Sequence, residues 1–245
     1  MKNLFISLAG FRILMQVRYD YTVNQCKDYV TDFSPDEADF IVSASEEEIE
    51  RERSLGQSTG MTASSGYAES ICLYRNLATQ LPERDALLMH AAVISDGEYA
   101  YAFTAPSGTG KSTHIRLWRT VIGDSIFVIN GDKPILRCVD GVWRAYGTPW
   151  CGKEGWHTNT SRPLAGICFL SRGEENRITK LLPAQSVPAM MHQILLPTSA
   201  ERVKTTLRHL DHLVTHVPLY RLECTISQDA ARLAHDTMKP ASENE

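Results

Sequence analysis

The sequence lacks long apolar runs, an excess of positive charge and any C-x-x-C pair of cysteines. No apolar run approaches the roughly 20 residues of a membrane-spanning helix, so we expect no membrane partner. The 25 Lys and Arg residues are outnumbered by 29 Asp and Glu residues, and the net charge of −4 offers no general footprint for nucleic acid. We interpret the six cysteines as reduced thiols, which predicts a cytoplasmic protein.

The rest of the composition is that of an ordinary globular protein. The 245 residues are 43% hydrophobic and 22% charged, which suits one large domain or a core domain with a small appendage. The sequence contains no internal repeat and no low-complexity tract. The chain starts with an apolar stretch, but the alternation of Phe11, Ile13, Met15 and Val17 favours a strand over a signal peptide.

The first quarter of the chain predicts a small α+β appendage. Its expected elements are one or two strands in 3–19 with a turn near Gly10, a short helix in 22–33, a strand in 38–45 and a charged helix in 45–54. Ser45 and Glu48, three residues apart, form a capping-box pattern at the start of that helix. Residues 56–66 are rich in Gly, Ser and Thr and predict a flexible connection. We therefore expect an appendage at 1–66 and a larger domain at 67–245.

The larger domain alternates strands and helices, which predicts an α/β fold with a mixed, twisted sheet flanked by helices. The apolar runs 86–95 and 98–104 form a hairpin around Asp96-Gly97, a strong turn signal. A second hairpin in 133–147 turns at Asp140-Gly141. The remaining expected elements are helices at 68–85, 112–121, 184–196, 199–214 and 227–238, and strands at 125–130, 164–172, 177–183 and 217–224.

The stretch FTAPSGTGKST, Phe103 to Thr113, matches the phosphate-binding-loop (P-loop) pattern G-x-x-x-x-G-K-[ST], except that Ala105 replaces the first glycine. It lies between a strand and a helix, where backbone N–H groups of the turn and of the helix N-terminus face an anion. Lys111 then reaches the β- and γ-phosphates, and the Ser112 hydroxyl ligates Mg²⁺. The predicted nucleotide-binding residues are Ser107, Gly108, Thr109, Gly110, Lys111, Ser112 and Thr113.

Two further positions decide how this motif is interpreted. Ala105 is the last residue before the turn, so its methyl group intrudes little and we expect the loop to form. Asp132 follows the next buried strand in FVINGDKP, a position from which a carboxylate can face the loop and help to hold Mg²⁺. The alternative interpretations are a chance Gly/Ser turn before a helix, and an ordinary turn aspartate at 132.

Together, MHAAVI, FTAPSGTGKST and FVINGDKPIL resemble the catalytic domain of HPr kinase/phosphorylase and the wider group with the phosphoenolpyruvate carboxykinase nucleotide-binding fold. The resemblance covers about residues 86–185 and extends to small HPr-kinase-like proteins of peptide-modification systems. It implies an ATP- and Mg²⁺-dependent kinase whose partner is a serine of a small protein or peptide, with His90 beside the transferring phosphate. Such family members are often hexameric, which raises the prospect of a homo-oligomer.

The chain departs from this resemblance in two places. HPr kinases end the second strand in two aspartates, whereas this chain has Gly131-Asp132, so the residue assigned there as the base is missing. Asp132 would then do both jobs, Glu154 would serve as the base, or the transfer would need little help from a base. The segment after residue 147 does not match the region that handles both phosphorylation and its reversal, so phosphorylase activity is not carried over.

Residues 146–166 are dense in polar and aromatic groups. Lys153 and Arg162 are candidates for holding phosphate or an acidic substrate, His157 could assist, and two tryptophans could form a pocket wall. The alternative is a long surface loop with its tryptophans packed on the core. The candidate catalytic residues are therefore His90, Lys111, Asp132 and Lys153, and the candidate metal ligands are Ser112 and Asp132.

Two other functions stay open at this point. One is a small-molecule, carboxykinase-like kinase, and the other is a non-catalytic nucleotide-binding protein that has lost its base at Gly131. Restoration of turnover by Gly131→Asp would favour the second. The sequence carries no base-recognition motif, so ATP, GTP and pyrophosphate all remain as donors.

Overall fold

The contacts of the chain gather into two compact units. The structure is a computed structural model that describes residues 1–58 and 63–240. Its units are Met1–Leu81 and Pro82–Glu245.

The smaller unit is a three-stranded sheet with helices. β1 (Lys2–Leu8) and β2 (Phe11–Val17) form an antiparallel hairpin, and β3 (Phe40–Ser43) adds parallel to β2. The turn expected near Gly10 is confirmed, with Ala9 and Gly10 both at positive φ. The helical segments are α1 (Asp20–Gln25), α2 (Glu46–Ser58), α3 (Ser65–Gln80) and short 3-10 turns at Lys27–Tyr29 and Pro35–Glu37.

Two helices of this unit differ in length from the sequence prediction. α1 is shorter than the helix expected in 22–33, because the chain tightens into a 3-10 turn after Cys26. α2 begins at the predicted capping box, in which Ser45 N donates to Glu48 Oε2 and Glu48 N donates to Ser45 Oγ. α2 also continues into the connection expected at 56–66, of which residues 59–62 lie outside the described residues.

α3 belongs to the smaller unit, so the division falls after Leu81 and not at residue 66. The buried Glu69 carboxylate of α3 accepts hydrogen bonds from the backbone N–H groups of Arg18 and Tyr19 and from the Thr22 hydroxyl. Two side chains further along α3 donate to backbone carbonyls of β3. The apolar stripe of this helix predicted that it is buried. These polar contacts determine that it packs in the smaller unit.

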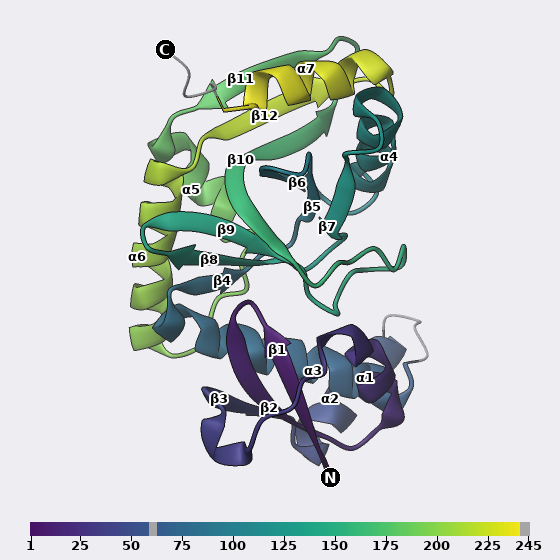
Figure 1. Ribbon diagram of the computed structural model, residues 1–245, viewed down its shortest axis with the longest axis vertical. Coiled ribbons are helices and arrows are strands. Elements are labelled where there is room, and N and C mark those ends of the chain that lie inside the picture. The colour runs from purple at the N-terminus through teal and green to yellow at the C-terminus, as the bar shows by residue number, and fades with distance from the viewer. Residues whose placement is uncertain (59–62, 241–245) are drawn as a thin grey trace. The chain divides into compact units, whose positions relative to one another are not determined.

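The larger unit is built on one nine-stranded sheet, which confirms the α/β class with a mixed sheet and flanking helices (Figure 1). The strand order is β4-β8-β9-β10-β6-β5-β7, and β12 pairs with β10 and β11. Both hairpins turn where the sequence predicts, at Asp96-Gly97 and at Asp140-Gly141. The strands are β4 (Ala86–Leu88), β5 (Ala92–Ser95), β6 (Ala100–Thr104), β7 (Phe127–Asn130), β8 (Ile135–Val139), β9 (Val142–Tyr146), β10 (Ser161–Arg172), β11 (Arg177–Leu181) and β12 (Leu219–Cys224).

The apolar run 86–95 forms two strands and not one. β4 pairs with β8, while β5 pairs with β6 and β7. Between them the backbone changes partners, since Met89 N donates to Pro134 O and His90 N donates to Gln193 O. Both strands are buried along their whole length, so hydrophobicity gave no sign of the break. The break leaves His90 outside both strands.

β10 connects two parts of the sheet. Its first residues, 161–163, pair antiparallel with β9. Beyond a register shift between Leu164 and Gly166, it runs parallel to β6 on one side and to β12 on the other.

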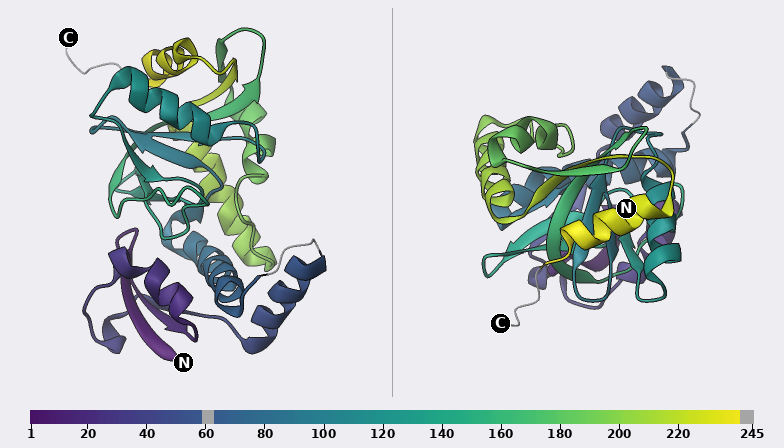
Figure 2. Two further views of the ribbon diagram at one scale, coloured as in Figure 1. Left: turned by 90° about the vertical axis from the view of Figure 1, so that its right-hand side faces the viewer. Right: turned by 90° about the horizontal axis from the view of Figure 1, so that it is seen from above.

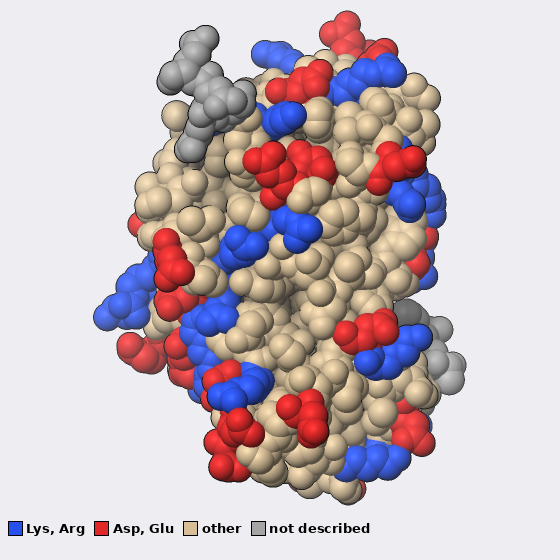
Figure 3. Space-filling model, viewed as in Figure 1, with Lys and Arg blue, Asp and Glu red and all other residues tan. Residues whose placement is uncertain are grey.

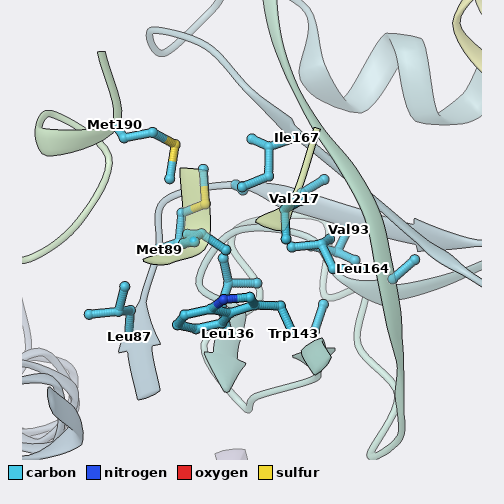
Figure 4. Packing of buried hydrophobic residues seen from close by; sticks show 14 of the residues in the cluster. Leu87, Met89, Val93, Leu136, Trp143, Leu164, Ile167, Met190 and Val217 are labelled. Carbon is cyan, nitrogen blue, oxygen red and sulfur yellow. The ribbon is translucent and has the colours of Figure 1, made fainter. Parts of the chain in front are cut away.

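Helices cover both faces of this sheet. α4 (Lys111–Ile122) and α7 (Gln228–Met238) contact each other on one face, as Figure 2 shows, and α5 (Pro183–Met191) packs with α6 (Ala200–His216) on the other. Side chains of β6 contribute to the cores on both faces of the sheet, because successive side chains of a strand point to opposite faces. Ala100 and Ala102 join the core under α5 and α6, part of which is drawn in Figure 4, while Tyr101 and Phe103 join the core under α4 and α7. α5 ends five residues before the position expected from the sequence.

The surface shows no dominant sign of charge on the side that is drawn. Lys and Arg side chains are interspersed with Asp and Glu over the face in Figure 3. Within the described part of the chain, no helix combines the length and the apolar character that crossing a membrane requires.

Candidate functional site

The strand directions bring the candidate residues to one edge of the sheet. β10 is parallel to β6 and β12, and β5 is antiparallel to both β6 and β7. The carboxyl ends of β6, β7, β10 and β12 therefore share an edge with the amino end of β5. The P-loop follows β6, Asp132 follows β7 and His90 precedes β5, so all three meet at this edge. Ligand sites of open α/β sheets lie outside the carboxyl ends of the strands.

The P-loop turns from β6 into α4 through two glycines. Gly108 has a φ of 77° and Gly110 a φ of 126°, values that strain any residue with a side chain. Gly110 is the N-cap of α4, and no side chain caps the first turn. The N-terminus of α4 therefore presents backbone N–H groups, with the positive end of the helix dipole, toward an anion.

Ala105 packs into the core, where its methyl group contributes to the cluster that contains Phe103 and Trp118. The strand, turn and helix form around it as the sequence predicts. Its carbonyl oxygen accepts a hydrogen bond of 2.9 Å from Lys111 Nζ, so the lysine reaches back over the loop. Burial lowers the pKa of Lys111 and the nearby charge of Lys133 adds to this, while the negative charge of Asp132 opposes it.

Asp132 is held between two basic side chains. His90 Nε2 lies 3.2 Å from Asp132 Oδ1, and Lys133 Nζ lies 3.1 Å from Oδ2. Burial works against ionisation of the Asp132 carboxyl, but the hydrogen bond with His90 and the charge of Lys133 outweigh it and leave its pKa below the usual range. The His90 side chain is 33% exposed, so His90 is not a buried core histidine.

The turn that carries Asp132 is fixed by Asn130, which the sequence analysis missed. Asn130 is fully buried at the end of β7, and its Oδ1 accepts hydrogen bonds from the backbone N–H groups of Asp132 and Lys133. Its Nδ2 donates to the carbonyl oxygen and the hydroxyl of Thr148. An asparagine two residues before a turn aspartate is the available sequence signal, since Asn side chains commonly bond to backbone N–H groups just ahead.

Gly131 leaves no room for the aspartate that the family pattern would place there. A Cβ atom at this position would lie 2.6 Å from Cys151 O and 3.4 Å from Trp156 O, both backbone atoms. The loop 148–158 causes this crowding, because it brackets the turn through bonds from Gly131 N to Trp156 O and from Lys133 N to Trp150 O. Glycine here is a packing requirement, so Gly131→Asp would distort the loop and does not test for a lost base.

The other candidates of the segment 146–166 are dispersed. Glu154 Oε2 accepts a 2.8 Å hydrogen bond from Arg116 of α4, whose guanidinium also lies over the Trp156 ring. Lys153 is exposed and forms no hydrogen bond or ion pair with the described residues. Arg162 Nε donates to Gly97 O, which places it at the opposite end of β6 from the P-loop, so it does not neutralise phosphate charge there.

The ring of Phe127 lies under the Arg162 guanidinium. His157 pairs through its backbone with Asn130. Burial raises the pKa of the Cys151 thiol, which disfavours the thiolate that a nucleophile would need.

Two cavities lie at this edge of the sheet, beside a hollow over the P-loop itself that Pro106, Ser107 and Gly108 line. One, of about 230 Å³, is lined by His90, Lys133 and the chain from His192 to Leu195. The other, of about 330 Å³, lies between the first turns of α4 and the ends of β10 and β12. His114 and Arg172 line the second cavity and were missed, because a histidine three residues after Lys111 and a strand-end arginine carry no distinctive pattern.

No protein-family model matches the chain, and no curated protein matches it. Among solved structures it is similar to one titled "Structure of the Hpr(Ser) kinase/phosphatase from Coxiella burnetii". That likeness has a TM-score of 0.35 and 9% sequence identity, and it covers 62% of this chain and 92% of the other. These values describe a distant likeness.

Proposed function

We propose that this chain is an ATP- and Mg²⁺-dependent kinase. It would transfer the γ-phosphoryl group to the hydroxyl of a serine in a small protein or peptide. The observation that carries the proposal is the placement of a P-loop lysine and a doubly held carboxylate at one edge of the sheet. Lys111 and Asp132 lie close enough that the charge of Asp132 affects the pKa of Lys111. Phosphoryl transfer depends mainly on positioning and charge, which such an arrangement supplies.

The nucleotide's phosphates would lie on the P-loop. Backbone N–H groups of Ser107 to Ser112 would surround the phosphates, and Lys111 would exchange its bond to Ala105 O for the β- and γ-phosphates. Thr113, which lines the larger cavity, would contact the part of the nucleotide nearest the sugar.

The residues present suit Mg²⁺. Within the described ranges no three His, Cys, Asp or Glu side chains cluster as a metal site, so the protein offers no complete cage. Mg²⁺ is usually held by one or two protein oxygens together with substrate phosphates and water. Ser112 and Asp132 would supply those oxygens, since each carboxylate oxygen can accept more than the one bond it makes here. Bound Mg²⁺ would neutralise phosphate charge.

The acceptor hydroxyl would enter through the smaller cavity. Its volume of about 230 Å³ is below the roughly 300–1,000 Å³ of cavities that enclose whole small molecules, which favours a single side chain presented by a peptide. His90 lines this cavity and touches Asp132, so a serine there would meet the Asp132 carboxylate. Because no acid fits at Gly131, Asp132 would both orient the hydroxyl and hold the metal. Lys153, in the loop beside Asp132, would add positive charge.

Calorimetric titration with ATP, with and without Mg²⁺, tests the proposal. We expect micromolar binding by the wild type, loss of binding in Lys111→Ala, and binding that no longer depends on Mg²⁺ in Asp132→Ala. Lys204→Ala, an exposed lysine of α6, is the matched control and keeps wild-type binding. Labelled phosphate from ATP should then reach serine peptides but not their alanine counterparts. Normal turnover by Lys111→Ala would refute the proposal.

A further inference from the structure

One wall of the smaller cavity is a piece of extended chain. Residues 192–195, which follow α5, line the cavity and pair with the chain that follows β4. His90 N donates to Gln193 O at 2.6 Å, and Leu195 N donates to Leu88 O at 3.4 Å. The segment therefore adds a short antiparallel strand next to His90.

The outer edge of this short strand is open. Ile194 pairs with Met89 between those two hydrogen bonds, and in such a pair the backbone N–H and C=O groups point away from the opposite strand. Neither group of Ile194 bonds to any described residue, and Ile194 lines the cavity. Open strand edges pair readily with another extended chain, which adds to the sheet as a further strand.

Gln193 adds a side-chain donor at the same wall. Its Oε1 accepts a 2.7 Å hydrogen bond from the Thr104 hydroxyl, which shares its single proton with His90 O at 2.9 Å. Thr104 is fully buried at the end of β6, so it fixes the direction of the partly exposed carboxamide. Gln193 Nε2 makes no hydrogen bond with the described residues, so its two N–H groups stay available at the cavity.

The size of the cavity limits what else can recognise an acceptor. Its volume of about 230 Å³ suits the acceptor side chain but not the side chains on either side of it. Recognition then depends on the main chain around the serine. The wall offers that main chain two kinds of donor and one acceptor, namely the carboxamide of Gln193 and the backbone N–H and C=O of Ile194.

We propose that Gln193 and Ile194 hold the main chain of the acceptor peptide in an extended conformation. Gln193 Nε2 and Ile194 N donate to peptide carbonyl oxygens, and Ile194 O accepts a peptide N–H. The inference rests on the proposed function and deepens it, because it makes the acceptor an extended segment and not free serine or a serine within a helix. Gln193 then determines which acceptors bind, while Lys111 and Asp132 act on the phosphate and the hydroxyl.

Initial rates of phosphate transfer by the full wild-type chain, with saturating Mg²⁺ and ATP, test this with three acceptors. The first is a library of nine-residue peptides with a fixed central serine. The second is the same library with N-methyl groups on the two residues after the serine, since successive N–H groups of an extended chain face opposite sides. The third is free serine. We expect the unmodified library to react about tenfold faster than either of the others, because both lack main-chain hydrogen bonds.

Variants at position 193 test the side chain. Gln193→Ala should raise the KM for the unmodified library about fivefold and leave kcat and the affinity for ATP unchanged. Gln193→Glu is nearly isosteric and still accepts from Thr104, but it lacks the donor, so it should show the same rise in KM without a risk of misfolding. Gln228→Ala, an exposed glutamine of α7, is the matched control and keeps wild-type kinetics.

The outcomes separate this inference from the proposed function. If the unmodified library reacts no faster than the N-methylated library or free serine, or if both Gln193 variants keep the wild-type KM, the inference is overturned and the kinase stands. If the wild type transfers phosphate to none of the three acceptors, the proposed function is overturned as well.

Discussion

Replacing Asn130 by alanine should destabilise the larger unit by about 3 kcal/mol. The amide makes four hydrogen bonds, but two of its partners keep another: Lys133 N still bonds to Trp150 O, and the Thr148 hydroxyl still bonds to Lys133 O. Asp132 N and Thr148 O lose their only partners among the described residues. Each buried orphan costs roughly 1–3 kcal/mol, which gives the expected magnitude.

Urea unfolding followed by tryptophan fluorescence measures this loss in the right unit. The larger unit contains all four tryptophans, Trp118, Trp143, Trp150 and Trp156. The smaller unit therefore does not contribute to the fluorescence signal. Asn176→Ala is the matched control, because the Asn176 amide also bonds a backbone N–H, that of Thr225, but at a partly exposed site. It should lose about 1 kcal/mol. A loss in Asn130→Ala no larger than in Asn176→Ala would refute the role of Asn130 in fixing the turn.

Three further predictions concern Gly131, His114 and Cys151, which pack inside the larger unit. Gly131→Ala should destabilise the larger unit by about 1–3 kcal/mol in the same urea titration, because the new Cβ atom would meet a backbone oxygen. Gly141→Asn, in the open turn between β8 and β9, is the control and should stay near wild-type stability. Equal losses of stability in the two variants would contradict the crowding at Gly131. Burial lowers the pKa of His114 to about 4, so below about pH 6.5 the unfolded chain binds a proton at this side chain that the folded protein does not bind. The free energy of unfolding should therefore fall by about 3 kcal/mol between pH 6.5 and pH 4 in the wild type. His114→Phe should not show this loss. Parallel pH profiles would contradict this. Since burial raises the pKa of Cys151, its alkylation by iodoacetamide at neutral pH should be slower in the folded protein than in urea, and equal rates would show an accessible thiolate.

The sequence predicted those features that depend on local pattern. Glycines at 108 and 110 between a buried strand and a helix led to the P-loop, and two Asp-Gly turns led to their hairpins. Asp132 was placed correctly at a strand end, because the apolar run before it ends there.

Features that depend on distant partners were not predictable. The partner change at Met89 and His90 depends on Pro134 and Gln193, which lie 45 and 103 residues further along the chain. The crowding at Gly131 depends on a loop about 20 residues away, so a position that looked like a lost acid proved to be a close backbone approach. In each case residues that are far apart in sequence determine the local structure.

The position of β12 inside the sheet has a consequence for how the protein is made. β12 lies between β10 and β11, although it is synthesised after both of them. Until it has left the ribosome, the long strand β10 carries one open edge, and open edges invite pairing with other chains. The P-loop edge is therefore completed only after β12 has been made, through contacts between residues about 50 apart. This predicts slow folding and a newly made chain that depends on protection from aggregation.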